Sequence, residues 1–295
     1  MSEDASTPGR DSTPEKRPTV LVAAFGGWTD AEDAASAALE HLALTWSSVT
    51  VREIDPDDYY DYQETRPTIS VSGGVTRHLR WPTTSISHCR LPHADRDLVF
   101  VVGTEPNMRW RAFCQEIVEA ALDLDVELAV VVGSAFSDTP HTRPVPISGS
   151  AHTAEAAARY GLVAADYEGP TGITGVLQDA FVQAGIPAIS LWASVPHYLA
   201  GPPNPKATLA LVRSLEPLIG TPVPIGVLPE QARQWEDGLN EMLFADDEMA
   251  AYVRELEQRH DAEPEVGMLT AMDGDALAAE FERYLRQRGG SGDER

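Results

Sequence analysis

Polar side chains that could bind a ligand or move a proton follow several apolar runs of the sequence, where predicted strands end. Carboxylates near a histidine can perform general acid–base chemistry once burial moves their pKa values toward neutrality. Ligands in open α/β sheets bind beyond the carboxyl ends of the strands, so these side chains should meet in one cleft. The residues predicted to line that cleft are Gly27, Trp28, Asp30, Thr104, Glu105, Ser134, Asp138, His141, Glu168, Ser194, His197 and Asn204.

Each of these residue types also has a structural use that involves no ligand. Asp30 precedes an apolar helical pattern and is suited to capping that helix. Glu105 stands before a proline and could close a turn, while His141 and His197 could be hydrogen-bonded parts of the scaffold. The pattern therefore predicts a pocket without naming a reaction.

The sequence lacks the motifs of several large enzyme classes. It has no GxxxxGK[ST] phosphate loop, no GxGxxG after its first apolar run and no GxSxG nucleophile elbow. It also has no HExxH or CxxC pair, so we expect neither a metal nor a cofactor. The predicted cleft contains no basic residue, and Glu105 and Glu168 would repel a phosphate.

The element that organises the chain spans residues 166–205. Gly169–Gly172 forms a turn, Thr171 is the expected cap of the next helix, and Gly185 is placed to end that helix. The apolar run Ile186–Trp192 then predicts a strand covered on both faces, which would carry Ser194 and His197 to its carboxyl end.

Three further apolar runs alternate with helical patterns. The predicted strands are Thr19–Phe25, Asp97–Gly103 and Val126–Gly133. Alternation of strands and helices predicts an α/β fold with a mostly parallel sheet and helices on both faces. We expect a weaker strand at Val49–Ile54, a hairpin or two short strands within residues 67–91, and a loop over residues 134–146.

After residue 226 the pattern becomes helical. A helix from Pro229 to about His260 should break near residues 244–247, with an inner face formed by Trp235, Leu239, Met242 and Leu243. A last helix would present Leu277, Phe281 and Leu285. The predicted organisation is a disordered leader (1–18), an α/β domain (19–226), a C-terminal helical segment (227–288) and a disordered tail (289–295).

The composition excludes some partners. The net charge is −24, with two lysines and twenty arginines, so binding of nucleic acid or an anionic membrane through a basic face is not expected. No apolar run approaches the roughly 20 residues that span a bilayer. Two isolated cysteines and the absence of an apolar signal segment favour a reducing, cytoplasmic location.

Six segments together resemble the PAC2 family, actinobacterial proteins similar to proteasome assembly chaperone 2. The resemblance runs from about Thr19 to Arg288. The segments are FGGWTDAEDAA (25–35), GTEPNMRW (103–110), GSAFSDTPHTRP (133–144), YEGPTGITGVL (167–177), WASVPHYL (192–199) and GDALAAEFERYLRQR (274–288). The resemblance implies a three-layer α/β body of the phosphorylase/hydrolase-like type with a C-terminal helical appendage, and self-assembly as a homo-oligomer, a trimer being the expected size.

The resemblance also implies a function through protein–protein contacts, in the assembly of a protein complex related to the proteasome. The alternatives are an enzyme of the nucleoside phosphorylase or hydrolase type, using the strand-end cleft, and a small-ligand sensor. Some relatives carry an ATP-grasp or carboxylate–amine ligase label, which no glycine-rich nucleotide loop supports here. Relatives that act on proteasome α-rings often end in a hydrophobic-Tyr-X tail, and the terminal Gly292–Arg295 differs from it, so docking in that mode is not expected.

Overall fold

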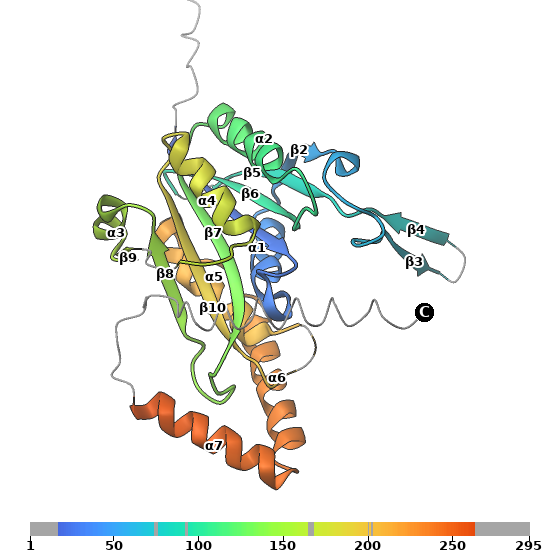
Figure 1. Cartoon of the computed structure of the whole chain (residues 1–295), viewed down its shortest axis with the longest axis vertical. Coiled ribbons are helices and arrows are strands. Elements are labelled where there is room, and N and C mark those ends of the chain that lie inside the picture. The colour runs from blue at the N-terminus through green and yellow to red at the C-terminus, as the bar shows by residue number, and fades with distance from the viewer. Residues whose placement is uncertain are drawn as a thin grey trace, which may run out of the picture.

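An eight-stranded sheet is the centre of the computed structural model, which describes residues 17–73, 76–91, 94–164, 168–199, 201 and 203–262 (Figure 1). Its strands are β1 (Thr19–Gly26), β2 (Val49–Ile54), β5 (Thr84–Arg90), β6 (Asp97–Thr104), β7 (Val126–Ser137), β8 (Ile147–Ala151), β9 (Val163–Ala164) and β10 (Ala188–Pro196). They lie in the order β2-β5-β6-β1-β7-β10-β8-β9. The predicted α/β class is confirmed.

The four strands predicted from apolar runs are neighbours in this sheet. β6, β1, β7 and β10 run parallel, in that order. Most of their residues are buried on both faces, as strands without polar alternation require. These strands align the carboxyl ends that deliver the candidate residues.

The two edges of the sheet depart from the parallel pattern. β5 and β2 add antiparallel strands beside β6, and β8 adds another beside β10. The predicted loop over residues 134–146 is wrong at its start, because β7 continues to Ser137 and pairs with β10 up to Pro196. β8, α3 (Ala154–Tyr160) and β9 were not predicted, because they are too short to show a period.

Helices cover both faces of the sheet, which makes three layers (Figure 1). On one face α1 (Ala34–Thr45) and α5 (Pro205–Ile219) pack against alternate residues of β1 such as Val20 and Val22. On the other face α2 (Trp110–Asp123) and α4 (Ile173–Gln183) pack against Leu21 and Phe25. Two 3-10 turns, η1 (Ala31–Asp33) and η2 (Pro56–Asp58), follow β1 and β2.

Helix α4 begins one residue later than predicted. Its N-cap is Gly172, so the assignment of Thr171 as the cap is wrong. A Cβ atom at residue 172 would lie 2.5 Å from Cγ2 of Thr29, and only glycine permits this approach. Gly185 ends the helix as predicted, in the left-handed conformation (φ = 81°) that glycine adopts without strain.

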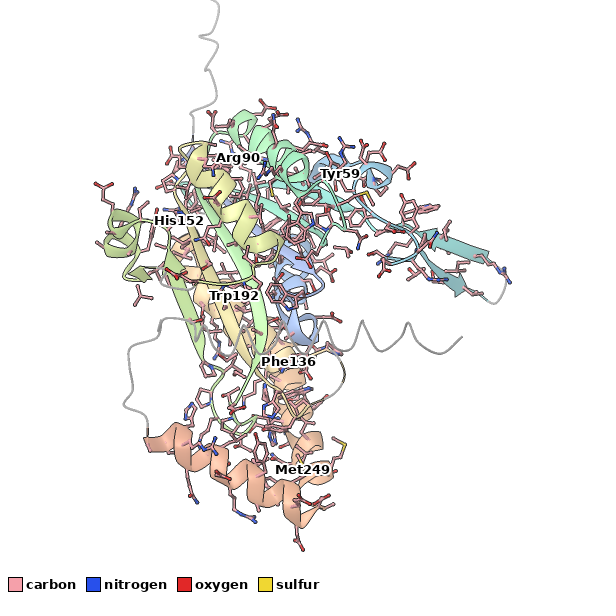
Figure 2. The ribbon with its side chains drawn as sticks, in the orientation of Figure 1. Tyr59, Arg90, Phe136, His152, Trp192 and Met249 are labelled. Atoms are coloured by element: carbon pink, nitrogen blue, oxygen red, sulfur yellow. The ribbon has the colours of Figure 1, made fainter. Side chains whose placement is uncertain are left out.

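The region 67–91 divides between two sheets. β3 (Thr68–Ser72) and β4 (Thr76–Arg80) form a separate two-stranded sheet, whereas β5 joins the main sheet. The predicted hairpin is therefore present, and we call β3 and β4 the hairpin. It projects from the body (Figure 1). Its side chains are drawn in Figure 2, and those of Ile69, Val71 and Leu79 are more than half exposed.

The helices after residue 227 form an arm, which we define as α6 (Leu228–Leu243) and α7 (Asp247–Ala262). The predicted break is confirmed. α6 packs on α5 and buries Leu228, Ala232 and Leu243, but the assignment of Met242 to the inner face is wrong, since its side chain is 62% exposed. The predicted helix with Leu277, Phe281 and Leu285 lies outside the described residues.

The predicted division at residue 227 stays a prediction, as do the leader and the tail. Residues 1–16 and 263–295 lie outside the described part of the chain. Arg17 is described, and its guanidinium forms an ion pair with Asp97 at 3.1 Å. Within the residues described, no helix is both long and apolar enough to traverse a bilayer.

Candidate functional site

The first group of candidate residues lies where β1 and β6 end against α4. Glu105 Oε1 accepts a hydrogen bond from the backbone N–H of Ile173 at 2.8 Å, so this carboxylate caps α4. Gly27 has φ = 134°, and a Cβ atom there would lie 3.2 Å from Cβ of Glu105. Trp28 packs beside Gly172. The structure thus brings Gly27, Trp28 and Glu105 together at a junction between a strand end and a helix.

The second group joins the ends of β1 and β7. Asp30 Oδ1 accepts hydrogen bonds from the backbone N–H groups of Ala35 at 2.7 Å and Ser36 at 3.2 Å. Ser134 Oγ donates to the carbonyl of Ala31 at 2.9 Å. Burial raises the pKa of Asp30. The alternative in which Asp30 caps the helix is the one observed.

Asn204 belongs to the same region and is fully buried. Its Nδ2 donates to Glu32 Oε2 at 2.9 Å, and its Oδ1 accepts from the N–H of Ala207 at 3.0 Å, which caps α5. Glu32 is only 6% exposed, and burial raises its pKa to about 7. Its Oε1 has no hydrogen-bond partner among the described residues.

Sequence reasoning missed Glu32. The residue has a left-handed backbone (φ = 53°), which is uncommon for a side chain other than glycine. It becomes buried because Asn204 and α5 pack against η1, so no local pattern reveals it. The Asn204–Pro205 pair was a usable signal for the helix start, since it places a capping side chain before a proline at the first helical position.

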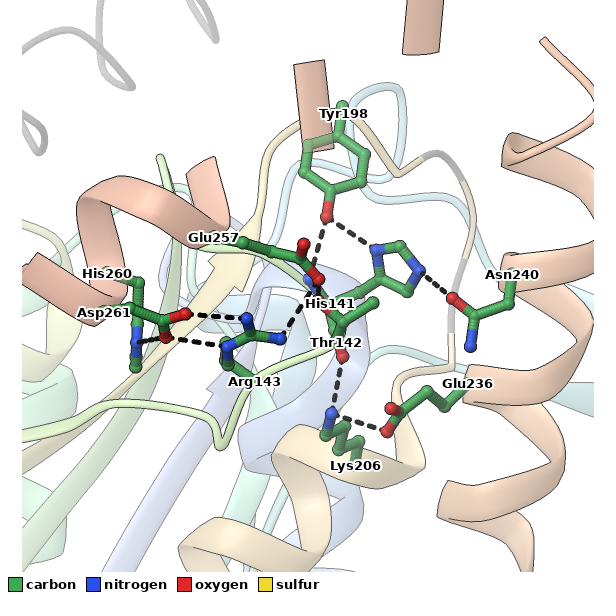
Figure 3. Close-up of polar contacts among 10 residues, drawn as sticks. All are labelled: His141, Thr142, Arg143, Tyr198, Lys206, Glu236, Asn240, Glu257, His260 and Asp261. Carbon is green, nitrogen blue, oxygen red and sulfur yellow. Dashed lines mark hydrogen bonds and ion pairs between the residues drawn. The ribbon is translucent and has the colours of Figure 1, made fainter. Parts of the chain in front are cut away.

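The third group connects the body to the arm through His141 (Figure 3). The hydroxyl of Tyr198 accepts from the backbone N–H of His141 at 2.8 Å and lies 2.7 Å from its Nδ1, so the hydroxyl proton is available to Nδ1. Nε2 then carries the ring proton and donates to Asn240 Oδ1 at 3.1 Å. This pattern fits a neutral imidazole. Burial is the main cause that lowers the pKa of His141.

His197 also faces the arm. Its Nδ1 lies 3.1 Å from Asp138 Oδ1, and its Nε2 lies 3.2 Å from the hydroxyl of Tyr252 on α7. Ser194 is half-buried, and its N–H donates to the carbonyl of Pro146 at 3.0 Å. The polar ends of β7 and β10 are thus occupied in contacts with the loop and with α7.

Two cations that the sequence analysis did not select complete this connection (Figure 3). Lys206 Nζ lies 2.6 Å from Glu236 Oε2 on α6 and donates to the carbonyl of His141 at 2.5 Å. Arg143 binds both oxygens of Asp261 at 2.8 Å and Glu257 at 3.1 Å, on α7. Lys206 is one of two lysines in the chain, and this rarity was the available signal.

Ten of the twelve candidates therefore fall into these three groups, and the backbone N–H of Asp30 joins the first two by donating to the carbonyl of Gly27 at 3.2 Å. Thr104 is half-buried and its carbonyl accepts from the hydroxyl of Tyr60 at 2.6 Å, while Glu168 is exposed before α4. A ligand cleft lined by all twelve stays a prediction. The described residues contain no group of three His, Cys, Asp or Glu side chains that could hold a metal ion.

A cavity of about 490 Å³ lies near the amino end of β10, at the opposite end of this strand from Ser194 and His197. Its lining is mainly apolar and comes from α3, the end of α4 and the start of β10. Residues around it include Ala156, Arg159, Tyr160, Val182 and Pro187. None of the twelve candidates contributes to this cavity.

Together, the fold and these contacts define a three-layer α/β protein whose strand-end polar groups cap helices and hold an arm. The PAC2 family model matches residues 24–243, and the chain belongs to the PAC2 family. No curated protein matches the sequence.

Solved structures agree with this assignment. A PAC2 family protein from Streptomyces avermitilis has 52% identity and a TM-score of 0.74, covering 80% of this chain and 99% of its own. A proteasome-assembly chaperone homologue from Mycobacterium tuberculosis has 53% identity and a TM-score of 0.72, covering 79% of this chain and 99% of its own. A Pyrococcus furiosus archaeal proteasome activator, 15% identical with a TM-score of 0.59 over 78% of this chain and 95% of its own, shares the fold.

Proposed function

We propose that this protein acts without catalysis, as a cytoplasmic assembly factor that binds other proteins, with proteasome subunits as the first partners to test. The observation that carries the proposal is the use of the strand-end polar groups. Glu105 and Asp30 cap helices, and His141 anchors the arm, so these groups are engaged in holding elements together. The similarity to a proteasome-assembly chaperone homologue supports the choice of partner.

We also propose that the protein works as a homo-oligomer, with a trimer as the expected size. Large apolar side chains lie in solvent on the hairpin and on the edge strand β2, where Val49 is 67% and Val51 51% exposed. Exposed apolar groups gathered on one part of a surface are typical of protein-binding sites. An edge strand also presents unpaired backbone groups to a partner.

The test is reconstitution of proteasome particles from purified α and β subunits of the source organism. With the full chain present, we expect complete particles and peptidase activity to appear several-fold faster, as followed on native gels. An equal amount of an unrelated acidic protein is the control for charge. An unchanged rate, with no complex between the chain and the subunits, would refute the proposed function.

The enzyme alternative is tested on the same preparation. Phosphate, nucleosides and ATP are titrated calorimetrically, and we expect no binding tighter than about 10 μM, which corresponds to roughly 7 kcal/mol. Tighter binding that Glu168→Ala abolishes would favour an enzyme over an assembly factor.

A further inference from the structure

The hairpin has one apolar face and one polar face. In its register Ile69 pairs with Leu79 and Val71 pairs with Arg77, so these four side chains share a face. The exposed fractions are 61% for Ile69, 58% for Val71 and 52% for Leu79. The other face carries the pairs Thr68–Arg80 and Ser70–His78.

This apolar face needs a cover that the described body does not provide. An isolated two-stranded hairpin is marginally stable in water, and a third strand or a packed partner is normally required. The hairpin is held at its base, where Trp81 packs edge-to-face on Tyr62 with ring centroids 4.7 Å apart. Burying one exposed apolar side chain against a partner would stabilise the hairpin as well as the complex.

The hairpin is also the basic part of an acidic chain. Residues 65–94 contain four arginines and no acidic residue, although the whole chain has a net charge of −24. Arg66, Arg77 and Arg80 lie exposed on or beside the hairpin. Its surface therefore suits a partner that is apolar at the centre and negatively charged around it.

The turn between α6 and α7 has those properties. We define the acidic tip as residues 241–248, where the side chain of Met242 is 62% and that of Phe244 is 42% exposed. The acids around these two side chains are all exposed, and they are Glu241, Asp246, Asp247 and Glu248. Residues 227–262 contain ten acidic residues and three arginines.

The hairpin and the acidic tip lie at different ends of the same molecule (Figure 1). We propose that the hairpin of one copy binds the acidic tip of a second copy. This inference rests on the proposed self-association and identifies the contact between copies. The two surfaces differ, so the contact is head-to-tail and closes into a ring when the rotation between copies permits.

The pairing of these two surfaces favours a second copy over an unrelated acidic protein. One repeated contact covers the apolar side chains of the hairpin and those of the acidic tip. Arg77, which shares the apolar face, meets a carboxylate there, while Arg80 on the other face adds positive charge beside the contact. The other occupant, an unrelated acidic protein, would leave Met242 and Phe244 uncovered.

The test measures the mass of the full chain by sedimentation and light scattering. In 50 mM NaCl the wild type should have a mass at least twice the 32.0 kDa of a single copy. It should dissociate to single copies in 1 M NaCl, because salt screens exposed charges. The variants R77E/R80E and E241R/E248R should each weaken self-association at least tenfold. The control R111E/R213E reverses two exposed arginines on α2 and α5 and should keep the wild-type mass.

The decisive variant is R77E/R80E/E241R/E248R, in which both surfaces have exchanged their charge. It should regain the wild-type mass, a result that loss of folding or a hairpin-to-hairpin contact would not give. Circular dichroism spectra verify that each variant is folded. A folded fourfold variant that stays monomeric overturns the proposal.

Two other outcomes also overturn it. A wild type that is monomeric up to about 100 μM in 50 mM NaCl removes both the contact and the proposed homo-oligomer. If the wild type assembles and R77E/R80E keeps its mass, self-association stands and the hairpin contact does not. These mass measurements use no proteasome subunits. A failure of the contact between copies is therefore distinguished from a failure of the proposed assembly function, which the reconstitution experiment measures.

Discussion

The hairpin and the arm both extend from the α/β body, but they are attached in different ways. The arm is joined to the body by hydrogen bonds and ion pairs from His141, Arg143 and Lys206, and α7 buries Val253 and Leu256 completely. The hairpin keeps the side chains of Ile69, Val71 and Leu79 more than half exposed. The arm is therefore fixed to the body, whereas the apolar face of the hairpin is exposed and available for a partner.

The largest expected difference is between two leucines. Leu256 in the arm is fully buried and Leu79 in the hairpin is 52% exposed. Leu256→Ala should lower the free energy of unfolding by about 2–4 kcal/mol, because it opens a cavity. Leu79→Ala should change it by less than about 0.5 kcal/mol. Urea unfolding followed by circular dichroism in 1 M NaCl, where the chain is expected to be monomeric, measures both.

Equal losses for the two leucine variants would contradict the comparison, since they would place the hairpin inside the stable body. A loss for Leu79→Ala alone would show that the arm contributes little to the folded chain.

A smaller effect is expected at the ion pair between α5 and α6. Lys206→Met leaves the carboxylate of Glu236 and the carbonyl of His141 without this cation, and should reduce the free energy of unfolding by about 1–3 kcal/mol. Arg80→Met on the hairpin is the matched control and should leave it unchanged within about 0.5 kcal/mol. Thermal unfolding in 1 M NaCl, where the chain is expected to be monomeric, compares the two. No loss for Lys206→Met would mean that the apolar packing of α6 holds the arm alone.

Glu32 tests the stability of the region on which the arm packs. Asn204 links Glu32 to the start of α5, and α6 packs on α5. The folded pKa of about 7 exceeds the ordinary value of 4.5, so the native state binds more protons than the unfolded state between these pH values. Wild-type stability should therefore fall as pH rises from about 4.5 to 7. Glu32→Gln should be more stable than the wild type by about 1–2 kcal/mol at pH 8.

The Glu32 prediction is measured by thermal unfolding between pH 4.5 and 8. The advantage of Glu32→Gln should shrink toward pH 4.5, where the wild-type carboxyl is protonated in the folded state and half protonated in the unfolded state. A variant that is less stable than the wild type at pH 8 would show that the ionised carboxylate is stabilised by a group outside the described residues.

The smallest effect is expected at His141. Its folded pKa lies below the ordinary value of 6.5, so the unfolded or detached state binds more protons as pH falls through that value. Acidification from pH 7 to 5 should weaken the attachment of the arm by about 1 kcal/mol or less. Hydrogen exchange, corrected for intrinsic rates, should become faster in α6 and α7 and stay unchanged in the hairpin.

His141→Gln is the control for this pH dependence, because it cannot gain the proton. Its arm amides should show no such acceleration at pH 5. Acceleration of the same size in the variant would assign the effect to groups other than His141.

Several parts of the fold were predictable because their signals are local. The four central strands lack polar residues, and a strand covered on both faces must be apolar along its whole length. Helix ends at Asn204 and Gly185 were also readable, since capping groups and left-handed glycines act within a few residues. The prediction of Met242 as buried was wrong because helical period alone does not define how wide the covered face is.

The candidate site was harder to predict. The sequence identified Asp30, Glu105 and His141 as polar groups at strand ends, and all three lie there. It did not identify Glu32, Arg143 or Lys206, whose partners are separated from them by many residues along the chain.

By itself, the sequence determined the four central strands and the helices that alternate with them, the acidic character of the chain and the basic segment at residues 65–94, because each depends on residues close together in the chain. Only the tertiary structure decided that His141 holds the arm and that the hairpin stays outside the main sheet. Those outcomes depend on which surfaces meet after the sheet forms. Burial, and with it the pKa of Glu32 and the exposure of Ile69, is a property of that packing.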